Sequence, residues 1–224
     1  MASSLSPDIL LISLNSPPWF DEMYGPLLTA LGTKAHVTRA ETAKTAVHAL
    51  ARLPPPSAVL VTDEALTLAA NRHVWLATVG YVCGGGTAVV AAMFPSFVQP
   101  DSIQPFFAQA GVPWGRGSYH RTTLTLDKAV VGDDVAATKL PSAYSQKAVF
   151  VSNVAPADAW YKPDDDDDPE VESSGFFSSG SSASVGGETA VALTRVGAGK
   201  LGYVGDVNAE TGSDVVILAM CGLA

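Results

Sequence analysis

The chain has few cysteines, no cluster of basic residues and no long apolar segment. Its only cysteines, Cys83 and Cys221, are too few for a disulfide framework. With 13 Lys and Arg against 22 Asp and Glu, the formal net charge is −9, and no basic face is visible. This balance excludes nucleic acid as an expected partner, since phosphate backbones are bound by clustered Lys and Arg.

The sequence also shows no signal peptide and no membrane-spanning segment. The first ten residues have neither the basic region nor the apolar core of a signal peptide. The apolar runs are short and interrupted, well below the roughly 20 residues that a membrane span needs. We therefore expect a cytoplasmic protein with no membrane partner.

The composition provides ample material for one hydrophobic core. Hydrophobic residues make up 47% of the 224 residues and charged residues only 16%. This length suits a single domain, residues 1–224. One segment differs: five consecutive aspartates at 164–168 precede a run rich in serine and glycine. Such a segment cannot bury enough apolar surface to order itself, so we expect a mobile surface loop at 163–187.

The first half alternates apolar runs with helical stripes. Short, nearly continuous apolar runs of this kind are typical of strands that are buried on both faces of a parallel sheet. Alternation of strands and helices predicts a parallel sheet with helices on both faces. The expected strands are 8–14, 36–40 (the weakest), 58–62 and 87–93, and the expected helices are 16–32 with a kink at 25–26, 42–52, 71–83 and 101–111.

The second half has a different pattern. Residues 118–126 alternate at period two and 147–154 form another apolar run, which predicts two more strands. Segments 188–196 and 201–207 flank a glycine-containing turn and predict a β-hairpin. A final apolar helix at 214–222 has Thr211 or Ser213 as its expected cap. The expected fold is therefore α/β and flavodoxin-like, with a mostly parallel central sheet flanked by helices and an antiparallel extension from the second half.

Four phrases carry a family resemblance: ILLIS, VLVTDEAL, YVCGGGTAVVAAMF and GAGKLGYVGDVN. With them the chain resembles the class I glutamine amidotransferase-like superfamily, including its DJ-1/PfpI and ThuA-like members, and a set of uncharacterised fungal proteins. The resemblance implies a functional turn after a central strand, where active members carry a cysteine. Here that turn is expected at 94–97, which contains no cysteine. The resemblance therefore predicts a protein without glutaminase activity that binds a small polar molecule in a cleft at the carboxyl ends of the strands.

A serine-dependent hydrolase is the first alternative function. Ser96 lies in the expected turn and could act as nucleophile if an imidazole took its proton. His120, in the next strand-like segment, is the best histidine for this role, and Asp206 the best acid to orient it. The competing interpretation places Ser96 in an ordinary turn and His120 in an ordinary strand. A second alternative is an oligomeric interaction module, with a homodimer as the expected partner.

Four further residues are candidates for ligand binding. Asp63 follows the strand 58–62, where a carboxylate would hold a polar ligand or cap the next helix. Phe94 belongs to the expected corner, and Trp114 and Arg116 open a segment that mixes aromatic rings, arginines and glycines. Such a mixture suits recognition of a carboxylate, a phosphate or a sugar.

No cofactor or metal is expected. The glycines at 84–86 lead from a helix into a strand, whereas phosphate-binding loops lead from a strand into a helix. The four histidines lack the spacing of metal ligands. Cys83 lies before the strand rather than after it, so we interpret it as a small apolar residue and not as a nucleophile.

Overall fold

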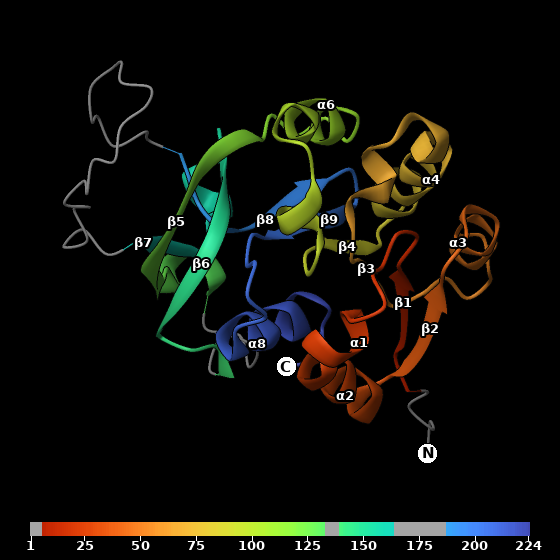
Figure 1. Ribbon diagram of the computed structural model, residues 1–224, viewed down its shortest axis with the longest axis horizontal. Helices are drawn as coiled ribbons and strands as arrows, with labels where there is room; N and C mark the ends of the chain where they lie inside the picture. Colours follow the sequence, from red (N-terminus) through yellow and green to blue (C-terminus); the bar gives the residue numbers. More distant parts are fainter. Residues whose placement is uncertain (1–5, 133–138, 164–186) are drawn as a thin grey trace.

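The computed structural model describes residues 6–132, 139–163 and 187–224, in which two sheets lie side by side (Figure 1). The larger sheet has the strand order β2-β1-β3-β4-β9-β8, with all neighbours parallel except β8 and β9. This confirms the expected mostly parallel α/β fold. The strands are β1 (Asp8–Ile12), β2 (His36–Ala40), β3 (Ala58–Val61), β4 (Thr87–Val90), β8 (Val191–Val196) and β9 (Gly199–Val204).

The central strands are buried on both faces, which explains their continuous apolar sequences. In β1, Ile9 and Leu11 belong to one core, while Leu10 and Ile12 belong to the core on the opposite face. Successive side chains of a strand point to opposite faces, so each strand must supply apolar residues to both.

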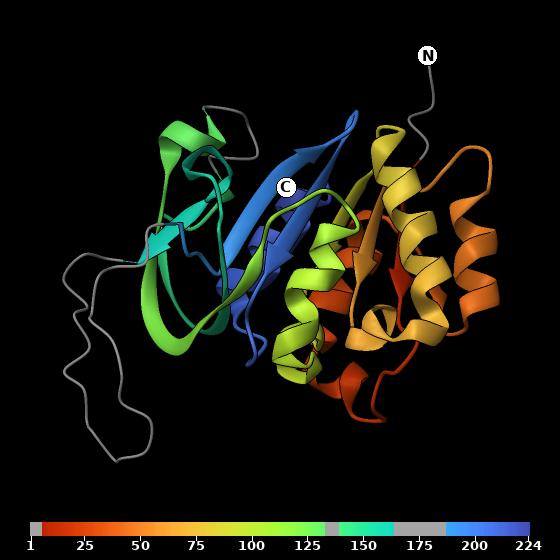
Figure 2. The ribbon, with the colours of Figure 1, turned by 90° about the horizontal axis from the view of Figure 1, so that it is seen from above.

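Helices cover both faces of this sheet (Figures 1 and 2). One face packs against α1 (Phe20–Met23), α2 (Gly25–Lys34) and α8 (Thr211–Met220), and the other against α3 (Ala43–Leu50), α4 (Arg72–Cys83) and α6 (Ile103–Ala108). None of the helices in the described residues is long and apolar enough to cross a membrane. The shorter helical segments are α5 (Phe94–Phe97), α7 (Lys128–Val131), η1 (Glu64–Thr67), η2 (Ala69–Asn71), η3 (Pro100–Ser102) and η5 (Pro156–Asp158).

Several helix ends differ from the expectation. The first helix is interrupted at Tyr24, where one kinked helix was expected, and its second part continues past Gly32 to Lys34. Thr42, expected as the first residue of its helix, is instead its cap, through a reciprocal capping box with Thr45. The caps expected for the last helix are wrong, because Thr211 and Ser213 lie inside α8, which begins after Glu210.

The second sheet is antiparallel, with the order β6-β5-β7, as the second half of the sequence predicts. Its strands are β5 (Gly115–Leu126), β6 (Ala143–Ser152) and β7 (Tyr161–Pro163). Isolated bridges from Ala148 to Asp206 and from Val151 to Thr189 attach it to the segments that flank the β8–β9 hairpin. The segment expected to be a mobile loop, 163–187, lies outside the described residues except at its two ends.

Candidate functional site

The chain turns sharply just beyond β4, at Ala92. The strand ends at Val90, and Ala92 has a φ of 59°, in the left-handed region that residues with a side chain rarely occupy. Met93 donates its N–H to the carbonyl oxygen of Thr62 at 2.8 Å, which holds this turn against the end of β3. A strained turn of this kind exposes the nucleophile in many hydrolases. Here an alanine occupies it, and residues 94–97, expected to be the turn, form the helix α5 instead.

A groove of about 610 Å³ opens beyond the carboxyl ends of β4 and β9, between the α5–α6 segment and the second sheet. Its size is typical of small-molecule sites. One wall is mostly apolar and the other, from β5, β6 and the loop after β9, carries most of the polar groups. The lining residues are Pro95, Ser96, Val98, Pro100, Ile103, Arg116, Gly117, Ser118, Tyr119, Val149, Val207 and Asn208.

A β-bulge in β5 shapes the polar wall. The pairing with β6 shifts register between Arg116 and Tyr119, and both of these side chains are exposed. Gly117 makes the close approach possible, since a Cβ at this position would lie only 2.7 Å from the carbonyl oxygen of Phe150. The bulge therefore places a guanidinium and an aromatic ring on the same side of the groove.

The Arg116 guanidinium is unpaired within the part of the chain that the structure describes. Besides its pairing with Val151 in the β5–β6 ladder, the residue accepts a hydrogen bond at its carbonyl oxygen from Ser152 Oγ at 3.0 Å. Its neighbour Ser118 holds an acidic side chain, because both its N–H and its hydroxyl donate to Glu188 Oε2, at 3.2 and 2.8 Å. The positive charge of Arg116 thus faces the groove without a direct counter-ion among these residues.

A network of charged side chains lies behind the polar wall, around Arg121 and Glu210. Arg121 Nη2 lies 2.6 Å from Glu210 Oε1, and Lys147 N donates to Glu210 Oε2 at 3.2 Å. The Asn208 amide, oriented so that its oxygen accepts from Arg121 Nη2 at 2.8 Å, joins the same network. The Lys147 ammonium lies 5.2 Å from the centre of the Tyr119 ring. These contacts hold Asn208 and Tyr119, the two members of the network that line the groove.

The structure does not bring Ser96, His120 and Asp206 together. Ser96 lines the groove, as does Tyr119, and His120 follows Tyr119 in the same strand, so its side chain points to the opposite face of the sheet. There the His120 ring stacks on Phe150, with 4.5 Å between ring centres. Asp206 is buried and bonds to backbone N–H groups. No hydrogen bond joins these three side chains among the described residues, and the hydrolase remains a hypothesis without geometric support.

Only one of the four ligand-binding candidates, Arg116, lines the groove. Phe94 and Trp114 are fully buried in an aromatic core around Phe107. Asp63 is also buried, and its carboxylate accepts N–H bonds from Asn15 at 2.9 Å and Ala65 at 3.1 Å, the second capping η1. Burial raises the pKa of Asp63 and these backbone bonds oppose the rise. Its capping role is therefore observed.

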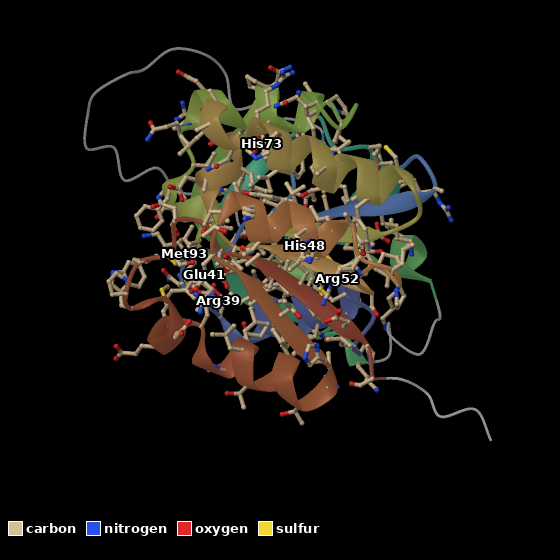
Figure 3. All side chains as sticks on the ribbon, turned by 90° about the vertical axis from the view of Figure 1, so that its right-hand side faces the viewer. Arg39, Glu41, His48, Arg52, His73 and Met93 are labelled. Carbon is tan, nitrogen blue, oxygen red and sulfur yellow. The ribbon has the colours of Figure 1, made fainter. Side chains whose placement is uncertain are left out.

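The cysteines and histidines form no reactive or metal-binding cluster. Cys83 ends α4 near the amino end of β4 and the β8–β9 turn, at the opposite end of the strands from the groove. Cys221 is buried, which raises the pKa of its thiol to about 12. Figure 3 shows His48 and His73 on different helices, α3 and α4. Within residues 6–132, 139–163 and 187–224, no group of three or more His, Cys, Asp or Glu side chains is placed to hold a metal.

Tyr119 and Asn208 were missed as site residues. Tyr119 belongs to the aromatic and arginine-rich segment that the sequence singles out, so its composition is a usable signal. Asn208 has no such signal, because it reaches the groove only through the packing of the loop after β9 against β6.

The fold resembles that of ThuA-like proteins. A ThuA-like protein from Bacteroides uniformis superposes with a TM-score of 0.63 at 10% identity, over 98% of this chain and 91% of the other. A second, from Parabacteroides merdae, has a TM-score of 0.52 at 14% identity, over 97% and 89%. These likenesses support the amidotransferase-like fold. The resemblance to DJ-1/PfpI and fungal proteins stays a prediction.

One region of a larger enzyme is also similar. The β-galactosidase of Bacillus circulans sp. alkalophilus matches with a TM-score of 0.55 at 11% identity, over 97% of this chain but 31% of that enzyme. No family model matches the sequence. No curated protein matches it either. At these identities the comparisons show the fold alone.

Proposed function

We propose that this protein binds a small anionic molecule in the groove, with Arg116 as the anchor for its carboxylate, phosphate or sulfate group. The observation that carries the proposal is the guanidinium of Arg116, which has no partner among the described residues and lies on the wall of a groove of about 610 Å³. A guanidinium offers a fork of donors that matches these oxyanions. In a chain whose net charge is −9, an arginine that has no direct counter-ion in the part of the chain that the structure describes is a local reversal of charge that favours an anion.

The other groove residues support a compact polar ligand. Tyr119 presents an exposed ring beside Arg116, against which the body of a ligand can pack. Ser96 is exposed on the facing wall, where its hydroxyl can hydrogen-bond to the ligand. In this proposal Ser96 is a binding group, and the strained turn at Ala92 supplies no nucleophile.

Arg116→Ala is expected to weaken anion binding by about 10- to 100-fold. A hydrogen-bonded charge contributes roughly 1.5–3 kcal/mol, and each 1.4 kcal/mol is tenfold in affinity. The measurement is a titration of the ¹⁵N-labelled protein with sulfate, inorganic phosphate and succinate, following the amides of Ser118, Tyr119 and Asn208. Arg116→Lys should retain part of the affinity, because it keeps the charge and loses the planar fork.

Arg195→Ala is the matched control. Arg195 is exposed on β8. In the β8–β9 ladder its backbone lies opposite that of Lys200, near the amino-terminal end of β9 and away from the groove. Its removal changes the net charge by the same amount and should leave the affinity unchanged. An equal loss in both variants would show unspecific attraction to charge, and no shift of the groove amides with any of the three anions would refute the proposal.

A further inference from the structure

The loop between β9 and α8 connects the groove to a buried carboxylate. Val207 and Asn208 line the groove, while Asp206 is only 5% exposed. Backbone bonds on either side of Asp206 fasten the loop to β6: Val149 N donates to Gly205 O at 2.9 Å, and Val207 N donates to Lys147 O at 3.0 Å. The rest of the loop, 208–210, has to be held in another way.

The Asp206 carboxylate provides that hold. Its Oδ1 accepts the N–H of Asn208 and its Oδ2 the N–H of Glu210, both at 2.7 Å. Bonds from N–H groups to a carboxylate are short and about twice as strong as neutral ones. The loop therefore wraps around the carboxylate: one oxygen fixes Asn208, which lines the groove, and the other fixes Glu210, which lies behind the lining residues.

These two residues carry the charged network that borders the groove. Glu210 binds Arg121 and the N–H of Lys147, and the Asn208 amide accepts from the same guanidinium. Displacing Glu210 would break its ion pair with Arg121, and displacing Asn208 would move a residue that lines the groove opposite α5. Together with the two backbone bonds to β6, the buried carboxylate therefore sets the geometry of this part of the wall.

We propose that Asp206 is a positioning residue for the groove: its ionised form fixes Asn208 and Glu210 in place, and its protonation loosens this wall and weakens anion binding. This inference rests on the proposed function for its second half. A proton taken from solvent turns one carboxylate oxygen into a hydroxyl, which faces an N–H as a second donor. One of the two backbone bonds is then lost.

The surroundings of Asp206 favour proton uptake under mildly acidic conditions. The groups that face it are the phenols of Tyr24 and Tyr144, the Ser213 hydroxyl, the Glu210 carboxylate and, through Tyr24, the Asp214 carboxylate. Burial raises the pKa of Asp206 to about 6 and the Glu210 carboxyl adds to the rise, against the bond from Asn208. Direct electrostatics would act in the opposite sense, since a neutral Asp206 repels an anion less. A loss of affinity on acidification would therefore indicate that the loop has loosened, since the removal of a negative charge alone would raise the affinity.

The first measurement needs no ligand. In ¹H–¹⁵N spectra from pH 8 to pH 5, the amides of Asn208 and Glu210 should shift together in the wild type, with a midpoint well above that of an exposed aspartate. In Asp206→Asn both shifts should disappear. In Asp214→Asn, which removes a neighbouring buried carboxyl that makes no bond to the loop, they should persist. Amides that do not titrate in the wild type, or that still titrate in Asp206→Asn, overturn the proposal.

The second measurement uses sulfate, whose charge is constant over this range. Wild type and Asp214→Asn should each bind sulfate at least threefold more weakly at pH 5 than at pH 7.5, while Asp206→Asn should bind weakly at both. Glu210→Gln, which keeps the loop and weakens its pairing with Arg121, should lower the affinity and keep the amide titration. An affinity that does not fall although the amides titrate overturns the positioning role. If sulfate shifts no groove amide at any pH, the proposed function fails, and the amide titration alone decides whether Asp206 holds the loop.

Discussion

Gly205→Ala is expected to lower the free energy of unfolding by about 3 kcal/mol or more. A Cβ at Gly205 would lie 2.0 Å from the carbonyl oxygen of Val149 and 3.1 Å from the ring of Tyr203. Both obstacles are held in place, because Val149 N donates to Gly205 O at 2.9 Å and the Tyr203 hydroxyl donates to Val149 O at 2.9 Å. Gly205 is itself held by its N–H, which donates to Ala190 O at 2.8 Å. Overpacking of this kind costs about 1–3 kcal/mol, and the backbone bonds that must break cost about 1 kcal/mol each.

Chemical denaturation measures this loss, and Gly32→Ala is its control. Gly32 is exposed within α2 and a Cβ there meets nothing within 4 Å. Alanine at this helical position should stabilise the protein by about 0.5–1 kcal/mol. Equal midpoints for Gly205→Ala and the wild type would show that the two sheets do not meet this closely at residue 205.

The sequence predicts the strands and helices of the larger sheet because burial determines their composition. A strand such as β1, covered on both faces, has to be apolar at every position, and a surface helix such as α3 has to carry one apolar stripe. These patterns are local, so they identify an element correctly even where its first or last residue is predicted wrongly. The ends themselves depend on single hydrogen bonds, as the wrong caps at Thr211 and Ser213 show.

The site is less predictable because its parts meet only through long-range packing. The sharp turn lies at Ala92, a residue type that gives no sign of a left-handed conformation. The sequence therefore predicts the turn at 94–97 instead. The bulge that exposes both Arg116 and Tyr119 cannot be read from the alternation of β5. Phe94 and Trp114 resemble ligand-binding aromatics in sequence, and their burial is visible only once α6 packs over them.

Asp214→Asn is expected to raise the free energy of unfolding by about 2 kcal/mol at pH 7.5 and to have almost no effect at pH 4. Asp214 lies in the first turn of α8, is 8% exposed and has no side-chain hydrogen bond or ion pair among the described residues. Burial raises its pKa from 3.8 to about 6. Between these values the unfolded chain loses its proton while the folded protein keeps it, so stability falls as the pH rises.

Above pH 6 the folded protein carries the full cost of this buried charge, at about 1.4 kcal/mol per pKa unit. The attraction between the carboxylate and the amino end of α8 offsets roughly 0.5–1 kcal/mol of it. Asparagine has a similar shape and no charge, so the variant should lack this pH-dependent loss. Urea denaturation at pH 4, 6 and 7.5 provides the test, with the exposed Asp101→Asn as a control that should match the wild type throughout. A stability difference that is the same at all three pH values would mean that Asp214 does not titrate between the folded and unfolded states as its burial requires.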